Sequence, residues 1–285
     1  MNFRALPVQL HSTAEDVARF FKNDRGISKF AIEEPANKDL DYRPTLQASS
    51  PECYDIWIEV SELPYLRSLD RAVLYCVTNA RPVKLYVAFP SGVPTSEYKK
   101  HVDEARANGV GAIEAAAGRC TVIHEARLLS LAGVRCEERS KFPQRYRAAL
   151  SSAETTFKNG DPSKGCAIVY DEIEALSRRV AKKIQSKKLT TKAAAVIPTA
   201  KTDRENWAPL MEALLREADF NKLPKELTKN MLMRVAALTS VRNDSGHKPK
   251  NKAAQTKRDR ELRTRFESAV DILRDFADAA KALHV

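Results

Sequence analysis

Two kinds of hydrophobic pattern divide this chain of 285 residues, and the division limits the folds it can adopt. Alternating apolar and polar residues, which are typical of β-strands, occur only before about residue 126. After Pro143, the apolar residues recur at helical spacing. We therefore expect an α/β domain over residues 1–130 and an all-α helical bundle over residues 143–285, joined by a charged connector.

The first domain is expected to hold one mixed sheet with helices between its strands. Its clearest strand is Cys53–Glu62, in which Tyr54, Ile56, Ile58 and Val60 share one face. Another strand, Val83–Phe89, ends before Pro90. Two short strands at 110–116 and 119–126 are expected to meet near Gly118. The expected helices are 12–24, 96–109, and 63–80, the last with Leu66, Leu69, Val73, Leu74 and Val77 turned inward.

The second domain is expected to be an up-and-down bundle of about five helices. A polar stretch at 186–205 is longer than an ordinary helical connection and is predicted to be a loop. The segment NGDPSKG at 159–165 is predicted to separate the first two helices. The predicted helices cover residues 143–158, 166–185, 207–218, 224–242 and 253–283.

Positive charge is concentrated in the second half of the chain. Residues 1–140 carry 18 Lys and Arg against 19 Asp and Glu, whereas residues 141–285 carry 30 against 18. Such a basic domain favours a polyanionic partner, RNA or DNA. The alternative is a basic helical domain whose charges only keep it soluble.

The remaining composition excludes several classes of protein. The five cysteines are odd in number and widely spaced, with no C-x-x-C pair, which argues against zinc fingers and disulfide frameworks. The first residues lack the pattern of a signal peptide, and no apolar run is long enough to span a membrane. We therefore expect a cytoplasmic protein with no membrane association.

One short motif carries the chemistry of the second domain. Arg242 and His247 lie five positions apart, Asn243 follows the arginine, and Gly246 is a common helix terminator. A permanent cation beside a group that titrates near neutrality suits phosphodiester cleavage. The alternative interpretation is an exposed basic helix end, where cations complement the helix dipole.

This motif within a basic helical bundle resembles the R-x(4–6)-H signature of the HEPN superfamily, over about residues 143–283. The resemblance implies a metal-independent endoribonuclease without a cofactor, in which an RNA 2′-hydroxyl attacks the adjacent phosphorus. His247 would be the general acid or base, Arg242 would stabilise the phosphorane, and Asn243 would orient the histidine or the phosphate. It also implies a homodimer through this domain, with two motifs facing one cleft.

Basic residues on either side of Pro249 are the candidates for holding the RNA backbone. The resemblance further implies a toxin or an abortive-infection antiviral effector. The alternatives are a solvated charged face and a non-enzymatic nucleic-acid-binding or regulatory protein. The candidate residues are Lys248, Lys250, Lys252, Lys257 and Arg258.

Residues 12–126 resemble the restriction-endonuclease-like fold with its PD-(D/E)xK motif. The matching segments are Asp41-Tyr42-Arg43-Pro44 and Asp55-Ile56-Trp57-Ile58-Glu59-Val60-Ser61. The resemblance places Asp41 and Glu59 at the metal.

Ser61 stands where the lysine belongs, and Lys84 on the next strand is the candidate to replace it. The favoured interpretation is a catalytically degenerate domain that binds a trigger, a regulatory partner or nucleic acid. A metal-dependent DNA nuclease is the alternative.

Overall fold

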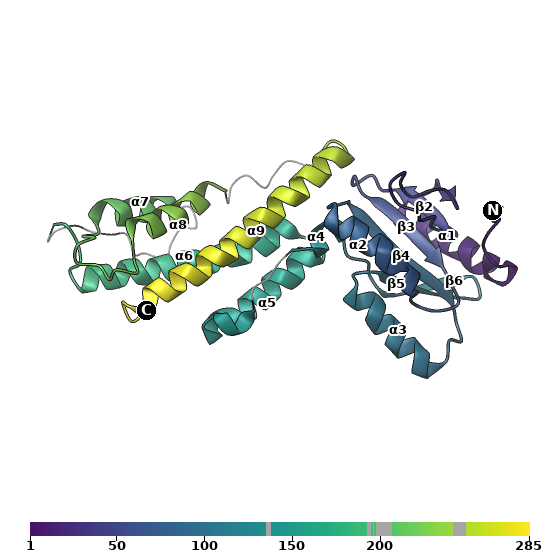
Figure 1. Ribbon diagram of the computed structural model, residues 1–285, viewed down its shortest axis with the longest axis horizontal. Helices are drawn as coiled ribbons and strands as arrows, with labels where there is room; N and C mark the ends of the chain where they lie inside the picture. Colours follow the sequence, from purple (N-terminus) through teal and green to yellow (C-terminus); the bar gives the residue numbers. More distant parts are fainter. Residues whose placement is uncertain (135–137, 193–194, 196, 198–206, 242–248) are drawn as a thin grey trace. The chain divides into compact units, whose positions relative to one another are not determined.

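The computed structural model describes residues 1–134, 138–192, 195, 197, 207–241 and 249–285. The chain separates into two compact units (Figure 1). The first contains Met1–Gly133, Lys158–Gly160 and Pro249–Glu261, and the second contains Val134–Phe157, Asp161–Lys248 and Leu262–Val285.

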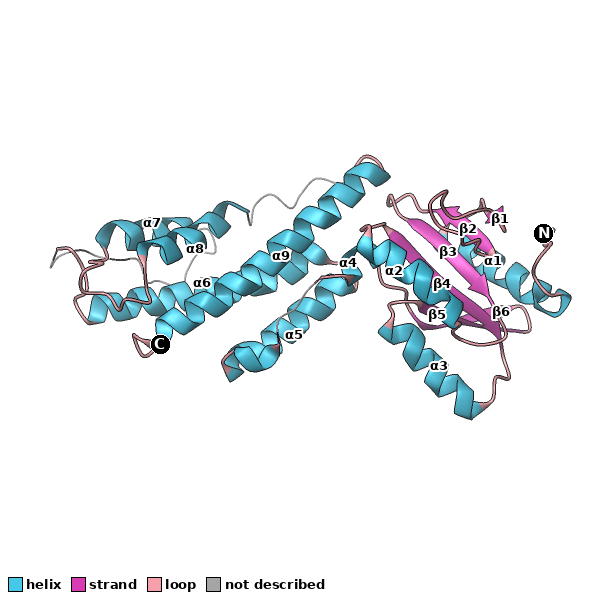
Figure 2. Cartoon of the chain, viewed as in Figure 1, coloured by secondary structure: helices cyan, strands magenta, loops and turns pink. Residues whose placement is uncertain are grey.

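The first unit is built on one mixed sheet of six strands in the order β1-β2-β3-β4-β5-β6 (Figure 2). The central strands β3, β4 and β5 are parallel, and the outer pairs are antiparallel. Parallel neighbours need crossover connections, which the helices α2 and α3 supply. The strands are β1 (Ala31–Ile32), β2 (Leu46–Ser49), β3 (Asp55–Val60), β4 (Val83–Pro90), β5 (Gly111–Ala116) and β6 (Arg119–His124).

Apolar layers cover both faces of this sheet. Helix α1 (His11–Arg25) packs on the face that carries Ile56, Ile58 and Val60. Helix α2 (Asp70–Thr78), α3 (Thr95–Ala107) and the short α4 (Leu129–Ala132) cover the opposite face, which carries Trp57. Successive strand residues point to opposite faces, so the alternating residues Ile56, Ile58 and Val60 of β3 all face α1. The predicted mixed α/β domain is confirmed at this level.

The expected helix over residues 63–80 is too long. Leu66 is extended, a 3-10 turn η2 (Arg67–Leu69) follows, and α2 begins only at Asp70, whose carboxylate accepts a hydrogen bond from the Tyr65 hydroxyl. Leu74, expected inside, has 66% of its surface exposed. Strands β1 and β2 were not predicted, because both are short and lie in a segment interrupted by prolines.

The first unit also includes the beginning of α9 (Lys252–Lys281), up to Glu261. The Ser130 hydroxyl donates to Asp259 Oδ2 at 2.6 Å, and Gln255 Nε2 donates to Asp259 Oδ1 at 2.7 Å. Asp259 is fully buried. Arg260 donates to the Asn79 carbonyl at 3.1 Å. The sequence placed this segment in the helical bundle, and the polar contacts explain why it groups with the sheet instead.

Helices dominate the described residues of the second unit, where the β-structure is the isolated bridge between Thr190 and Ala218. Its core includes Phe157, Leu176, Trp207, Val235 and Phe266, each almost fully buried. The helices are α5 (Gln144–Lys158, with its last residue in the first unit), α6 (Pro162–Ser186), α7 (Trp207–Glu217), α8 (Lys229–Val241) and α9 from Leu262 onward.

Two helix starts differ from the prediction. Helix α6 begins at Pro162, four residues before the expected Cys166, because the Asp161 side chain accepts from the Lys164 amide at 3.0 Å and a proline suits the first turn. Gly165 fits within this helix because α5 passes close by: a Cβ there would lie 2.8 Å from the Cβ of Phe157. Helix α8 starts at Lys229 rather than near Pro224.

No helix in the described part of the chain is long and apolar enough to cross a membrane.

Candidate functional site

Helix α8 leads directly into the predicted ribonuclease motif. Its first turn is capped by Thr228, whose hydroxyl oxygen accepts from the Met231 amide at 3.1 Å. Leu232, Val235 and Leu238 bury one face of the helix. The last described helical residue is Val241, immediately before Arg242. The chain therefore enters the motif from a packed helix.

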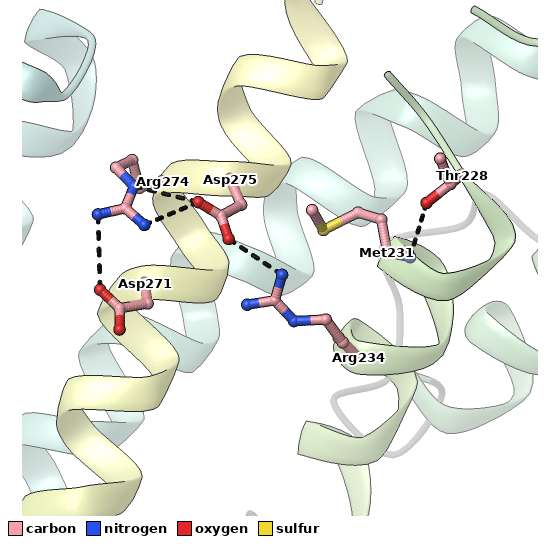
Figure 3. A network of polar contacts seen from close by, with 6 residues as sticks. All are labelled: Thr228, Met231, Arg234, Asp271, Arg274 and Asp275. Atoms are coloured by element: carbon pink, nitrogen blue, oxygen red, sulfur yellow. Dashed lines mark hydrogen bonds and ion pairs between the residues drawn. The ribbon is translucent and has the colours of Figure 1, made fainter. Parts of the chain in front are cut away.

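A polar network holds α8 to α9 within the second unit (Figure 3). Arg234 Nη1 donates to Asp275 Oδ2 at 3.0 Å, and Arg274 Nη2 donates to Asp275 Oδ1 at 2.9 Å. Arg274 also lies 3.6 Å from Asp271. Burial opposes the charged form of Asp275, but the hydrogen bonds from Arg274 and Arg234 lower its pKa. Asp275 is therefore an anion at neutral pH, and it fixes α8 two turns before the motif.

The motif itself lies outside the described residues. This applies to Arg242, Asn243 and His247, the predicted catalytic residues, and to Lys248, a predicted RNA contact. Their roles stay predictions. The structure describes the segments on either side of the motif: helix α8 before it, and the segment that starts at Pro249 after it.

The predicted phosphate-binding cations after the motif differ in their surroundings. Lys250 and Lys257 are exposed. Lys252 donates to Ser49 Oγ at 3.0 Å and forms an ion pair with Asp55. Arg258 is half-buried and takes part in a polar or electrostatic contact. Lys252 thus has a carboxylate partner where the prediction requires a cation free to bind phosphate, since Asp55 lies beside it at the start of β3.

The two alternative metal ligands of the first unit, Asp41 and Glu59, differ in their surroundings. Asp41 is exposed, whereas Glu59 is half-buried and its Oε2 accepts from the Tyr42 hydroxyl at 3.0 Å. Burial raises the pKa of Glu59 to about 7, against the lowering effect of the Tyr42 and Thr45 hydrogen bonds. Among the described residues, no group of three His, Cys, Asp or Glu side chains has the arrangement of a metal site.

Lys84 cannot replace the missing lysine beside Glu59, because the two residues belong to opposite faces of the sheet. Lys84 pairs with Ile56 in the β3–β4 register and so shares the α1 face. Its ammonium lies 4.9 Å from the centre of the Tyr54 ring. Glu59 lies two positions after Trp57 in β3, so the two residues share the opposite face. The candidate role for Lys84 is therefore wrong.

From the sequence alone, Arg4, Arg43 and Tyr42 have no expected role, but the fold brings them close to Glu59. Arg4, Arg43 and Glu59 line one cleft, and Tyr42 is hydrogen-bonded to Glu59. Arg4 is 55 positions from Glu59 in the sequence, and no periodic pattern links them. Of the residues at this cleft, only Glu59 is singled out from the sequence, as the acidic residue of the restriction-endonuclease-like motif.

No family model matches the chain, and comparisons with curated proteins and with solved structures likewise find no match.

Proposed function

We propose that the protein is a metal-independent endoribonuclease of HEPN type, which cleaves RNA with Arg242, Asn243 and His247. The observation that carries this proposal is the spacing R-N-x-x-x-H directly after α8, a helix packed in a mainly helical unit. The unit also carries an excess of basic residues, with 26 Lys and Arg against 18 Asp and Glu. Such a charge favours a polyanionic substrate.

The proposed reaction divides two tasks between the charged residues. The RNA 2′-hydroxyl loses its proton and attacks the adjacent phosphorus, and the 5′-oxygen leaves with a proton, giving a cyclic phosphate and a 5′-hydroxyl end. His247 moves the proton, since imidazole titrates near neutral pH. Arg242 stabilises the developing phosphorane charge with donors that stay protonated. Asn243 orients the histidine or the phosphate.

Two further elements belong to this proposal. The second unit forms a homodimer in which the motifs of two copies act on one RNA. The first unit serves as a regulatory domain that receives a trigger or a partner. In this role the protein is a toxin or an antiviral effector, and its controlled expression is expected to stop bacterial growth, whereas a His247→Ala variant is not.

The test is cleavage of labelled RNA and DNA in the presence of EDTA or of magnesium. The proposal requires RNA cleavage that resists EDTA and is lost in His247→Ala and Arg242→Ala. Glu59→Ala is the matched control, because it removes an acidic group from the other unit and should leave cleavage unchanged. Magnesium-dependent cleavage of DNA that is lost in Glu59→Ala would assign the reaction to the first unit. RNA binding without cleavage would instead indicate a non-enzymatic protein.

A further inference from the structure

A cleft of about 690 Å³ opens beside the carboxyl end of β3 in the first unit. Its charged lining residues are three acids, Glu33, Glu34 and Glu59, and two arginines, Arg4 and Arg43. Arg4 comes from the amino-terminal segment, and Arg43 comes from the loop before β2. The volume falls within the range of small-molecule sites, which is about 300–1,000 Å³.

One wall of the cleft is an amino-terminal strap, residues 4–6, which the fold fixes in place. The Glu33 carboxylate accepts hydrogen bonds from the amides of Arg4 at 2.7 Å, Ala5 at 2.9 Å and Leu6 at 2.8 Å. The His11 ring contacts the Leu6 carbonyl through Nε2 at 3.0 Å. These contacts therefore keep Arg4 at the cleft before any ligand arrives.

Glu33 reaches the strap from a strained backbone. Its φ of 51° lies in the left-handed region, which is unfavourable for a residue with a side chain. Burial opposes the charged form of Glu33, but the three amide hydrogen bonds lower its pKa. Its negative charge is thus satisfied by the chain itself, so that Glu33 competes weakly with a ligand for the arginines.

The two arginines are available to a ligand. Both are exposed, and neither guanidinium has an ion-pair partner in the part of the chain that the structure describes. A guanidinium binds carboxylate or phosphate oxygens with paired hydrogen bonds. Two such groups lining one preformed cleft favour an anionic ligand.

Glu59 adds a group that can either donate or accept. Because burial raises its pKa to about 7, a large fraction of the carboxyl is protonated at neutral pH. Oε2 is already occupied by the Tyr42 hydroxyl. A protonated Glu59 does not repel an anion and can donate its own hydrogen bond.

We propose that this cleft binds a small molecule that carries an oxyanion, a phosphate or a carboxylate, through Arg4 and Arg43, with Glu59 as its hydrogen-bonding partner. The site is distinct from the proposed ribonuclease motif and does not depend on it. It defines the chemical class of the ligand that the proposed regulatory unit binds. The strap provides the preorganisation that lowers the entropic cost of binding.

Calorimetric titration of the full chain with inorganic phosphate, uridine monophosphate and succinate tests the proposal. We expect saturable binding of at least one probe, weakened about tenfold or more in Arg4→Ala and in Arg43→Ala. Arg71→Ala, an exposed arginine on α2, is the matched control and should bind as the wild type does. Phosphate and uridine monophosphate binding would identify a phosphate ligand, and succinate binding a carboxylate. The proposal fails if no probe binds saturably, or if the Arg4 and Arg43 variants bind normally.

The same titration at several pH values tests the role of Glu59. As the pH rises through about 7, Glu59 gains a charge that repels an anion, so wild-type affinity should fall relative to that of Glu59→Gln. Glu59→Gln has no ionisable group at this position, so its affinity should lack this part of the pH dependence. The probe changes its own charge with pH equally for both proteins, and the difference between the two profiles therefore reports on Glu59. An identical pH profile in the two proteins would overturn the assignment of Glu59. The surrounding titratable or charged groups are Arg4, Glu33, Glu34, Tyr42, Arg43 and Cys76.

Discussion

The two units concentrate their candidate chemistry in different ways. In the first, the cleft joins Arg4, Arg43 and Glu59, which are far apart in the chain and meet only because the sheet and the strap bring them together. In the second, the candidate residues Arg242, Asn243 and His247 occupy six consecutive positions after one helix. The first site therefore depends on the tertiary fold of its unit. The second depends on local sequence, and the fold has to supply only the helix before it.

The largest expected effect is a separation of the two sites by mutation. His247→Ala should lower RNA cleavage by about 10²–10⁴-fold, the usual contribution of a general acid or base. It should leave oxyanion binding to the first unit intact. Conversely, Arg4→Ala should weaken that binding about tenfold or more without lowering the cleavage rate in the absence of a ligand. Cleavage assays and calorimetry on the same preparations check this, and a loss of both properties in either variant would contradict two independent sites.

Removing the Asp259 carboxylate should destabilise the first unit strongly. Asp259→Ala leaves the buried Ser130 hydroxyl without this acceptor and the Gln255 amide without its bond, which should cost about 3 kcal/mol. Urea unfolding, with hydrogen exchange over α9, measures the loss. Asp278→Ala on the same helix is the control, since its partner Lys281 is exposed and the change should be under about 0.5 kcal/mol. Equal effects of the two variants would show that the start of α9 is not held to the sheet.

Glu59→Gln should stabilise the first unit above neutral pH. The folded pKa of Glu59 is raised to about 7, so the folded state holds a proton that the unfolded state has already lost, and wild-type stability falls as the pH rises from about 4.5 to 7. Glutamine removes this loss, a gain of about 2–3 kcal/mol at pH 8 and little at pH 4. Denaturant unfolding at both pH values checks the sign. Equal stability of the two proteins at pH 8 would mean that Glu59 is not buried as described.

The smallest effect concerns α2. Because Leu74 is 66% exposed, Leu74→Ser should change the free energy of unfolding by less than about 0.5 kcal/mol. Its neighbour Val73 is 8% exposed, and Val73→Ala should cost about 1–2 kcal/mol. Thermal unfolding compares the two. A larger loss for Leu74→Ser would restore the inward face predicted from the helical pattern.

Much of the fold follows from periodicity alone. The strands β3 to β6, helix α1, and helices α5, α7 and α9 lie near their predicted limits, because each is long or strongly patterned. The short strands β1 and β2 are not predictable in this way, because a few residues between prolines carry no periodic signal. Helix starts were missed where a side-chain cap decides them, as Asp161 does for α6.

The candidate sites show the same difference between local sequence patterns and contacts of distant residues. The sequence by itself determined the α/β and helical halves, the basic excess and the six-residue motif, because these are properties of neighbouring residues. Only the tertiary structure decided that Lys84 and Glu59 occupy opposite faces of the sheet, that the start of α9 belongs to the first unit, and that Arg4 reaches the cleft of Glu59. Contacts between distant residues depend on strand register and burial, which local patterns do not encode.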